Sequence, residues 1–459
     1  MQKDRIHDYI VPGRRAHLVG IGGVSMSPLA EVLHDEGLII TGSDMKESPT
    51  VAHLRSRGIE VVIGHLPQSV EGKELVIRTA AVHDDNPEIA AALKAGIPVF
   101  ERAEAWGSIM RRYENALCIS GTHGKTTTTS MCTHIALAAQ TDPTVMIGGT
   151  LPLLGTGHRV GKGKTIILES CEYRNSFLSF FPTVAVILNI EADHLDFFRD
   201  LEDVKRSFRA FADLVPENGT VLANGEDRNT MDALDGKPGV LTFGLESGDY
   251  HAASLTWADG YPAFDLVHRG ETVCHIALKV PGLHNVKNAV AAAAASHVLG
   301  IPGEVIARGL GDFKGAGRRF EFKGRIHGAD IYDDYAHHPG ELKALLDMAG
   351  SLGYRRVVCA FQPHTYSRTK ALFDEFAQVL SQPDVTYLAE IFAARETNDV
   401  GVTSEDLAKA VPGAKAAPSL DTLTQWLAEE ARPGDLILTV GAGNIYTVGE
   451  DLAKLGENE

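Results

Sequence analysis

The stretch ALCISGTHGKTTTTSM, residues 116–131, decides the fold class. Its apolar first part, Ala116–Ser120, predicts a buried strand, and the glycine turn after it ends in Gly124-Lys125-Thr126 before a helical pattern. Strand, glycine loop, Gly-Lys-Thr and helix together indicate a phosphate-binding loop, in which backbone N–H groups cradle phosphates, Lys125 adds a positive charge and the Thr126 hydroxyl reaches Mg²⁺. The loop is two residues shorter than the common pattern, and a coincidental tight turn is the alternative interpretation.

Short apolar runs of the same kind recur along the chain, each followed by glycine or polar residues and then a helical pattern. Runs of this length suit strands that are buried on both faces, as in parallel sheets covered by helices. The alternation of strand and helix therefore predicts an α/β fold. The strands that we expect are residues 16–19, 38–40, 75–77, 116–119, 165–168, 184–188, 357–361 and 436–440.

The length of 459 residues is enough for two to four domains. We expect three: a Rossmann-like domain over residues 1–112, a phosphate-loop ATPase domain with a mostly parallel sheet over 113–317, and a Rossmann-like domain over 318–459. The stretch 241–280 differs from its surroundings, with short alternating segments and turn signals at Asp259-Gly260 and Arg269-Gly270. It predicts a small antiparallel insertion in the second domain.

The composition excludes several classes of protein. With 44% hydrophobic and 22% charged residues, the chain is neither disordered nor collagen-like. Its 43 basic and 60 acidic residues give a net charge of −17, which argues against nucleic-acid polymers and anionic membranes as partners but not against a small anionic substrate. The five cysteines form no Cys-x-x-Cys pair, the first residues are polar, and no long apolar run occurs. We therefore expect a cytoplasmic protein.

Another glycine turn, which is the first along the chain and is formed by Gly20, Gly22 and Gly23, separates an expected strand from a helical pattern over 26–34. Glycines let the backbone approach a phosphate, and the helix N-terminus adds partial positive charge. Asp44 follows about twenty residues later, in the position of the ribose-binding acid of dinucleotide enzymes. Because the spacing is G-x-G-G, a nicotinamide site, a plain turn and a site for another nucleotide diphosphate all stay open.

Polar side chains follow two expected strands of the second domain, at the carboxyl ends where α/β sheets bind ligands. Glu169 and Glu172 come after the first strand, and Glu172 is well placed to bind Mg²⁺. The residues after the second strand are Asn189, Glu191, Asp193, His194 and Asp196. Imidazole is not a preferred Mg²⁺ ligand, so His194 is either structural or part of the site.

Further candidates come later in the chain. Asn285 and Asn288 lie on one face of an alanine-rich helix, where Asn285 is either its N-cap or, with Asn288, a contact to adenine or ribose. Arg318-Arg319 stands at a domain junction and suits a phosphate clamp. Two polar clusters after expected strands are either solvated loops or a second-substrate site: residues 333–339 and 361–370.

These stretches together resemble the Mur ligases, the ATP-dependent amino-acid-adding enzymes of peptidoglycan synthesis. The resemblance covers essentially the whole chain and is strongest to the alanine-adding members, through HLVGIGGVSMSPLAEVL (17–33) and FQPHTYSRT (361–369). The other matching stretches are GTHGKTTTTSM (121–131), NIEADHLD (189–196), GLHNVKNA (282–289), GRRFE (317–321) and DDYAHHPGE (333–341).

The resemblance implies a substrate for each domain. The first domain would bind UDP-N-acetylmuramate, the second would bind ATP with two Mg²⁺, for which Mn²⁺ could substitute, and the third would close as a lid and bring L-alanine. L-alanine would be joined to the lactyl carboxylate through an acyl phosphate, in cell-wall synthesis and hence in cell shape and division. The alternative within the family is a recycling ligase, which attaches a tripeptide.

The resemblance also assigns residues. Lys125 would contact the phosphates, Thr126 and Glu172 one Mg²⁺, and His194 a second, while Arg319 and Asp334 would contact ATP from the closing side. The full sets are Gly121, Thr122, His123, Gly124, Lys125, Thr126, Thr127, Asn285, Asn288, Arg319 and Asp334 for ATP; Gly20, Gly22, Gly23, Ser25, Ser43, Asp44 and His65 for the UDP substrate; and His338, His364 and Arg368 for the amino-acid and acyl site.

Two positions depart from the family pattern. Arg209 stands where several members carry a carbamylated lysine, and Cys171 in Glu169-Ser170-Cys171-Glu172 replaces an acid near the metals. Two further classes of function stay open from the residues alone. One is a dehydrogenase that uses the first glycine turn, and the other is a nucleotide-gated binding protein.

Overall fold

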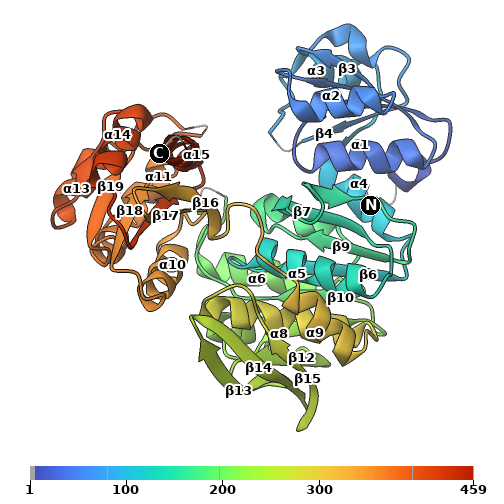
Figure 1. Cartoon of the computed structure of the whole chain (residues 1–459). Coiled ribbons are helices and arrows are strands. Elements are labelled where there is room, and N and C mark those ends of the chain that lie inside the picture. The colour runs from blue at the N-terminus through green and yellow to red at the C-terminus, as the bar shows by residue number, and fades with distance from the viewer. Residues whose placement is uncertain (1–5, 80, 196, 395, 458–459) are drawn as a thin grey trace. The chain divides into compact units, whose positions relative to one another are not determined.

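The computed structural model of the chain describes residues 6–79, 81–195, 197–394 and 396–457. By their contacts the residues form two compact units, each described below by itself (Figure 1). The described part contains no helix that is long and apolar enough to cross a membrane. The first unit comprises Met1–Ser254, Phe264–Ile276 and Lys287–Phe313, and the second comprises Leu255–Ala263, Ala277–Val286 and Lys314–Glu459.

The N-terminal part of the first unit is an α/β layer built on five parallel strands in the order β3-β2-β1-β4-β5. Leu18 of β1 shares its core with α1, α2 and α4, while its neighbour Val19 packs with α3 and η3 on the opposite face. The bounds are η2 Ile6–Asp8, β1 Arg15–Val19, α1 Met26–Asp35, β2 Ile39–Asp44, α2 Pro49–Ser56, β3 Glu60–Ile63, η3 Pro67–Val70, β4 Leu75–Arg78, α3 Pro87–Lys94, β5 Val99–Glu101 and α4 Arg102–Met110.

A ten-stranded sheet follows, in the order β15-β14-β13-β12-β11-β10-β6-β9-β7-β8. Its strands from β12 to β7 are all parallel, and β8 is antiparallel to β7. The bounds are β6 Asn115–Ser120, α5 Lys125–Ala138, β7 Thr144–Leu151, β8 Thr156–Arg159, β9 Thr165–Glu169, η4 Tyr173–Ser179, β10 Val184–Ile187, α6 Leu201–Ala212, β11 Thr220–Asn224, α7 Arg228–Ala233, β12 Val240–Gly244, β13 Tyr250–Ala258, β14 Tyr261–His268, β15 Glu271–Ala277, α8 Leu283–Val298 and α9 Gly303–Gly311.

Two expectations of the sequence analysis are corrected here. The stretch that was expected to be antiparallel from residue 241 begins with β12, which pairs in parallel with both β11 and β13, so its first strand continues the parallel part of the sheet. The turns at Asp259-Gly260 and Arg269-Gly270 are confirmed, since all four residues have positive φ, as tight hairpin turns require. Asn285 is not an N-cap, because α8 already begins at Leu283.

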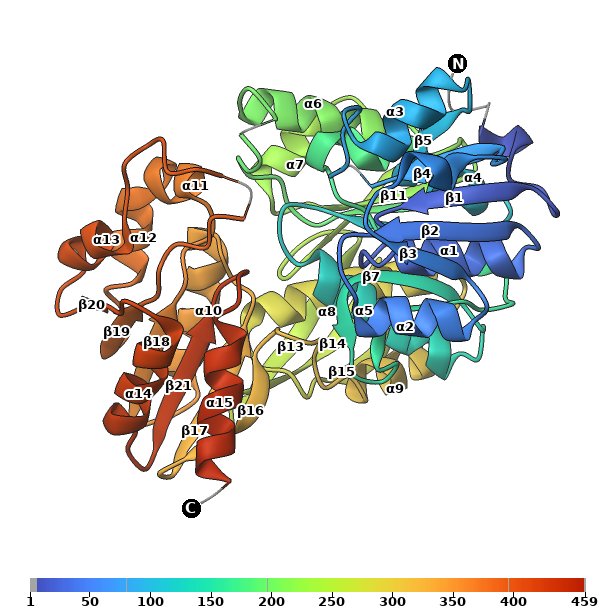
Figure 2. The ribbon, with the colours of Figure 1, turned by 90° about the horizontal axis from the view of Figure 1, so that it is seen from above.

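The second unit contains a six-stranded sheet in the order β16-β17-β21-β18-β19-β20. Leu436 and Leu438 of β21 pack with α10, α12 and α13, whereas Ile437 between them packs with α14 and α15 on the other face. Figure 2 shows α15 lying along β21. The bounds are β16 Glu321–Ile326, β17 Ala329–Asp334, α10 Pro339–Ser351, β18 Arg356–Phe361, α11 Tyr366–Ala371, α12 Phe373–Val379, β19 Val385–Leu388, α13 Ser404–Ala410, β20 Lys415–Ala416, α14 Leu420–Glu430, β21 Asp435–Val440 and α15 Tyr446–Gly456.

Candidate active site

The loop between β6 and α5 has the strand–loop–helix geometry that its sequence predicts. Gly124 precedes the helix in the left-handed conformation, with φ of 84°. A Cβ on Gly124 would lie 2.5 Å from Oδ1 of Asn288, so both the backbone and the space around it require glycine. Asn288, which the sequence analysis associated with the nucleotide, therefore lies directly against this loop.

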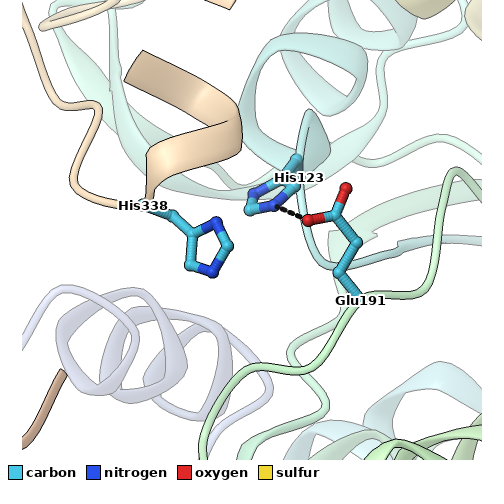
Figure 3. A group of neighbouring side chains, drawn as sticks. All are labelled: His123, Glu191 and His338. Atoms are coloured by element: carbon cyan, nitrogen blue, oxygen red, sulfur yellow. Dashed lines mark hydrogen bonds and ion pairs between the residues drawn. The ribbon is translucent and has the colours of Figure 1, made fainter. Parts of the chain in front are cut away.

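The segment after β10 supports the loop from its other side. Asn189 accepts a hydrogen bond from the His123 backbone N–H at 2.8 Å, and its side-chain amide donates to the His123 carbonyl at 3.1 Å. Glu191 donates its backbone N–H to the Thr122 hydroxyl at 2.9 Å, and its carboxylate lies 3.2 Å from His123 Nε2 (Figure 3). Asn189 and Glu191 thus fix the shape of the phosphate loop.

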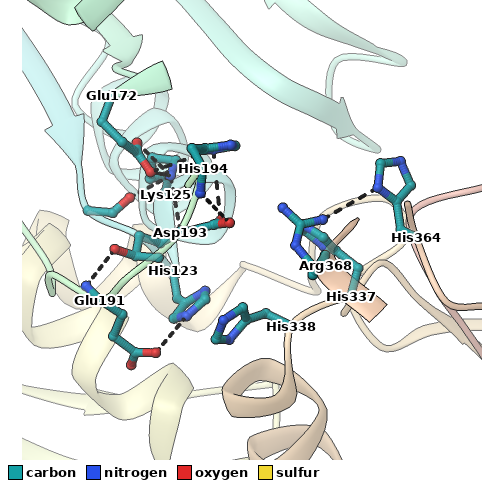
Figure 4. A network of polar contacts seen from close by, with 12 residues as sticks. His123, Lys125, Glu172, Glu191, Asp193, His194, His337, His338, His364 and Arg368 are labelled. Atoms are coloured by element: carbon teal, nitrogen blue, oxygen red, sulfur yellow. Dashed lines mark hydrogen bonds and ion pairs between the residues drawn. The ribbon is translucent and has the colours of Figure 1, made fainter. Parts of the chain in front are cut away.

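Lys125 lies beside the carboxylate of Glu172 (Figure 4). Its Nζ is 3.1 Å from the Glu172 carboxylate, which is 2% exposed, and it donates to the carbonyls of Gly121 and Thr122. Burial lowers the pKa of Lys125, but the charges of Glu172 and of nearby Glu169 outweigh burial and raise that pKa above its ordinary value. Lys125 is therefore always positively charged.

The carboxylate of Glu169, to which the sequence analysis gave no role, lies beside Thr126. Thr126 donates its hydroxyl to Glu169 Oε1 at 3.0 Å, and the Gly148 backbone N–H donates to the other oxygen at 2.6 Å. Burial raises the pKa of the Cys171 thiol to about 11, so it stays neutral between the two acids. The negative charge on this side of the loop comes from Glu169 and Glu172.

His194 completes this group in the first unit. Its Nε2 lies 4.0 Å from Glu172 Oε1 and 3.8 Å from Asp193 Oδ2, and its ring packs on Tyr173 with centroids 4.7 Å apart. Asp196, named with it in the sequence, lies outside the described residues. The oxygens of Thr126, Glu169 and Glu172 are of the kind that Mg²⁺ and Mn²⁺ prefer, whereas the imidazole of His194 is not. The donor set thus fits a divalent cation.

Arg209, at the position of the family's modified lysine, belongs to a different environment. Its guanidinium lies 3.2 Å from the Asp213 carboxylate one helical turn away, and it donates to the Asp235 carbonyl. Lys205, the nearest lysine, pairs with Glu202 at 3.0 Å and with Asp232 at 3.5 Å. Both side chains are thus engaged in ion pairs on helix α6.

The first glycine turn is held in shape by Asp44. One carboxylate oxygen accepts the Gly22 backbone N–H at 2.8 Å, and the other accepts the Met45 backbone N–H at 2.8 Å. The backbone N–H groups of Gly20 and Ile21 both donate to the carbonyl of Ser43. Asp44 thus acts on the turn itself, at the carboxyl ends of β1 and β2, where α/β sheets bind ligands.

The two adjacent arginines of the second unit differ in role. Arg318 pairs with buried Asp333 at 2.8 Å and donates to the carbonyls of Gly441 and Gly443. Arg319 makes no ion pair with any residue in the described part of the chain, and its guanidinium lies 5.0 Å from the Tyr335 ring centre. Arg318 is therefore held by partners within the unit, whereas Arg319 forms no ion pair among the described residues.

We expect Arg318→Ala to destabilise the second unit, because Asp333 would remain as a buried, uncompensated charge. Losing one partner of such a pair costs about 3 kcal/mol or more. Thermal unfolding of the two single variants tests this, with Arg319→Ala as the matched control that should unfold close to the wild type. Equal losses of stability in both variants would contradict the division of roles.

Asp334 lies next to Arg319 in a buried position at the end of β17. Its two oxygens accept the backbone N–H groups of Phe320 at 2.7 Å and Ala336 at 2.8 Å. Burial raises the pKa of Asp334 to about 6, although the positive charge of Arg319 opposes this rise. The carboxyl group therefore changes its charge within the range of pH at which enzymes work.

A cluster of rings and charges follows β17 and β18 in the same unit (Figure 4). His364 lies 3.4 Å from the Arg368 guanidinium, its ring stacks on Phe392 at 5.6 Å, and the His337 ring meets it edge-on at 5.8 Å. His338 accepts the Gly340 backbone N–H and caps α10. The structure brings His364 and Arg368 together as expected and adds His337, which the sequence analysis did not select.

Comparisons with known proteins give a consistent result. Three family models match in order: "Mur ligase family, catalytic domain" at residues 15–114, "Mur ligase middle domain" at 119–296 and "Mur ligase, glutamate ligase domain" at 318–443. The UDP-N-acetylmuramate–L-alanine ligase of Agathobacter rectalis is 47% identical over 447 residues, which are 95% of this chain and 97% of the relative.

Solved structures agree with these matches. The UDP-N-acetylmuramate-alanine ligase of Thermotoga maritima superimposes with a TM-score of 0.81 at 28% identity, covering 97% of this chain and 99% of that one. A murein peptide ligase of Psychrobacter arcticus gives a TM-score of 0.71 at 24% identity, over 97% and 99% of the two chains, and is similar in fold.

Proposed function

Because this chain belongs to the Mur ligase family, we propose that it joins L-alanine to the lactyl carboxylate of UDP-N-acetylmuramate at the expense of ATP. One observation carries the proposal: a UDP-N-acetylmuramate–L-alanine ligase is 47% identical to it over 95% of its length. The alternative, attachment of a tripeptide, is less well supported, since the murein peptide ligase has the lower identity and TM-score. A cytoplasmic location fits a reaction that consumes ATP.

The first half of the proposed reaction makes a carboxylate reactive. The lactyl carboxylate attacks the γ-phosphorus of ATP, which gives an acyl phosphate and ADP. Lys125 and the backbone of the loop would hold the phosphates, and their charges would stabilise the transferring group. Thr126, Glu172 and His194 would hold Mg²⁺, which neutralises phosphate charge when bound. Glu169 would orient Thr126, to which it is hydrogen-bonded.

In the second half, the amine of L-alanine attacks the acyl carbon and phosphate leaves. We propose that residues 318–459 form the domain that supplies Arg319 and Asp334 to ATP, and His364 and Arg368 to the reacting groups. The support is that Arg319 lacks an ion pair within the described residues and that His364 and Arg368 lie together. Asn285 would act through the turn before α8, since its amide donates to the Pro281 carbonyl at 2.7 Å.

We further propose that residues 1–112 bind the UDP group at the first glycine turn and that residues 113–317 bind ATP. The glycine turn, Ser25, Asp44 and His65 all belong to the carboxyl edge of the first sheet or the loops after it. The nicotinamide alternative would leave the phosphate loop around Lys125 without a function.

The function is tested by measuring ADP formation with UDP-N-acetylmuramate and a panel of acceptors: L-alanine, L-serine, glycine and a muropeptide-type tripeptide. We expect turnover that requires both UDP-N-acetylmuramate and L-alanine and that depends on Mg²⁺ or Mn²⁺. Turnover with the tripeptide but not with L-alanine would establish the recycling activity instead. Phosphate release that ignores both acceptors would indicate a nucleotide-gated binding protein.

The raised pKa of Asp334 predicts how activity depends on pH. Below about pH 6 the carboxyl group is protonated and no longer balances the charge of Arg319, so kcat/KM for ATP should fall about tenfold per pH unit. In Asp334→Asn this acidic limb should be absent. A pH profile of both proteins between pH 5 and 8 checks the prediction, and an unchanged limb in the variant would contradict it.

The same pKa has a consequence for stability. It lies above the ordinary value of 3.8, so the folded protein binds the proton more tightly than the unfolded chain. The contribution of Asp334 to stability is therefore complete below about pH 4 and is lost as the pH rises through 6. Unfolding of the wild type relative to Asp334→Asn over this range measures it.

A further inference from the structure

A carboxylate with two histidine partners is buried at the carboxyl edge of the N-terminal sheet. Glu88 is the second residue of α3, and its side chain is completely buried, as is that of Ser43 at the end of β2. His17 of β1 is 1% exposed. Sequence analysis gave Glu88 no role, and the proposed reaction does not use it.

Glu88 accepts hydrogen bonds from four groups. One oxygen lies 3.3 Å from His17 Nε2 and 3.4 Å from the Leu66 backbone N–H, and the other lies 2.5 Å from the Ser43 hydroxyl and 2.9 Å from His65 Nδ1. Burial alone would raise the pKa of Glu88, but these hydrogen bonds, led by those from His17 and Ser43, lower it to about 2. Glu88 is thus an ionised carboxylate, which accepts hydrogen bonds and donates none.

This arrangement determines which nitrogen of His65 carries hydrogen. A carboxylate has no hydrogen to give, so Nδ1 of His65 must donate to Glu88. The contact of 3.1 Å between Nδ1 and the Ser43 oxygen fits the same state, because the Ser43 hydroxyl already donates to Glu88. In the neutral ring Nε2 then has no hydrogen and can only accept.

His65 is also the member of the network that a ligand can reach. Its side chain is 12% exposed, whereas Glu88 and Ser43 are fully buried. It lies two residues after the end of β3, and the backbone N–H of Gly64 before it donates to the carbonyl of Asp44, the residue that shapes the first glycine turn. Nε2 has no hydrogen-bond partner within the described ranges of the chain.

We propose that Glu88 is a positioning residue for substrate binding: by holding the hydrogen of His65 on Nδ1, it presents Nε2 as an acceptor to a hydrogen-bond donor of the uridine, a ribose hydroxyl or the uracil imide N–H. The inference rests on the proposed binding of UDP-N-acetylmuramate at this edge of the sheet. Ser43 is buried and is a positioning residue as well: its hydroxyl donates to Glu88 and contacts His65, and it does not touch the substrate.

The first test needs no substrate. Histidine ring ¹⁵N NMR of the full chain, with the His65 signals identified by their loss in His65→Gln, should show neutral rings with hydrogen on Nδ1 at pH 8. Glu88→Gln should give a mixture of the two tautomers, because an amide can donate as well as accept. An Nε2–H tautomer or an imidazolium in the wild type, or an unchanged tautomer in Glu88→Gln, would overturn the proposal.

The second test measures binding. Glu88→Gln should weaken calorimetric binding of UDP-N-acetylmuramate about tenfold, the value of one hydrogen bond, with kcat and the KM for ATP within about twofold of the wild type. Glu31→Gln is the matched control. Glu31 is also buried and contacts two histidines, His158 at 3.0 Å and His53 at 3.5 Å, and its variant should bind as the wild type does.

The outcomes separate the inference from the proposed function. If the wild type does not bind UDP-N-acetylmuramate, the proposed function fails, whatever the tautomer. If it binds and Glu88→Gln binds equally well, only the role of Glu88 is wrong. Should Glu88→Gln not fold, Glu88→Asp keeps the charge but shortens the side chain, so that its carboxylate no longer holds the hydrogen on Nδ1 of His65. A mixture of tautomers and a loss of affinity are then expected, and a wild-type tautomer with wild-type affinity would overturn the proposal.

Discussion

Lys125→Ala should lower the rate of ligation about a thousandfold, because the site would lose the fixed positive charge that stabilises the phosphates during transfer. The pKa of Lys125 is raised, so this charge is present at every pH at which the enzyme works. Binding of UDP-N-acetylmuramate should stay within about twofold of the wild type, since Lys125 and the first glycine turn belong to different sheets. Steady-state kinetics and calorimetry measure the two effects separately.

Lys237→Ala is the matched control for this variant. Lys237 is 15% exposed and pairs with Asp213 at 2.8 Å, much as Lys125 is 13% exposed and pairs with Glu172. It lies away from the phosphate loop and should keep full activity. Loss of UDP-N-acetylmuramate binding in a Lys125→Ala protein that still unfolds cooperatively would show that the two sites are not separate.

Glu172→Gln should lower kcat about a hundredfold and raise the concentration of Mg²⁺ needed for half-maximal rate, because the proposed metal site would lose a charged ligand and Lys125 would lose its partner. Glu169→Gln should be far less damaging. Its amide oxygen can still accept one of the two hydrogen bonds that Glu169 now receives from Thr126 and Gly148. Titration of the rate with Mg²⁺ in the three proteins distinguishes the two roles.

Equal losses of kcat in the two variants would overturn this assignment. The neutral thiol of Cys171 makes the comparison sharper, because no third carboxylate of that segment is present to replace either acid. Each variant thus removes one of the two negative charges that lie beside the phosphate loop, that of Glu169 next to Thr126 or that of Glu172 next to Lys125.

The parts of the fold that the sequence predicts are those with a local signal. The apolar runs of β1, β6, β10 and β21 were predicted because a strand buried on both faces needs an unbroken apolar run. The start of the antiparallel segment was misplaced, because β12 pairs in parallel with strands on both of its sides and this pairing leaves no local signal in the sequence.

In the candidate site, too, the sequence predicts only the residues that belong to a local motif. Lys125 and Thr126 follow from a contiguous motif, whereas Glu88 meets His17, Ser43 and His65 across 71, 45 and 23 positions. In sequence, Glu88 resembles any acidic residue in the first turn of a helix. Likewise nothing in the pair Arg318-Arg319 tells which one turns inward, because the choice depends on Asp333 and on the carbonyls of a distant loop.

The contact between Gly124 and Asn288 limits how the protein could evolve resistance to a compound that binds the phosphate loop. Any other amino acid at position 124 would place its Cβ 2.5 Å from the Asn288 amide oxygen. A second mutation that shortened Asn288 would remove this clash, but it would leave a φ of 84° that a residue with a side chain rarely adopts. Neither a change at position 124 alone nor this pair of changes keeps the present shape of the loop, so resistance would have to arise at other positions.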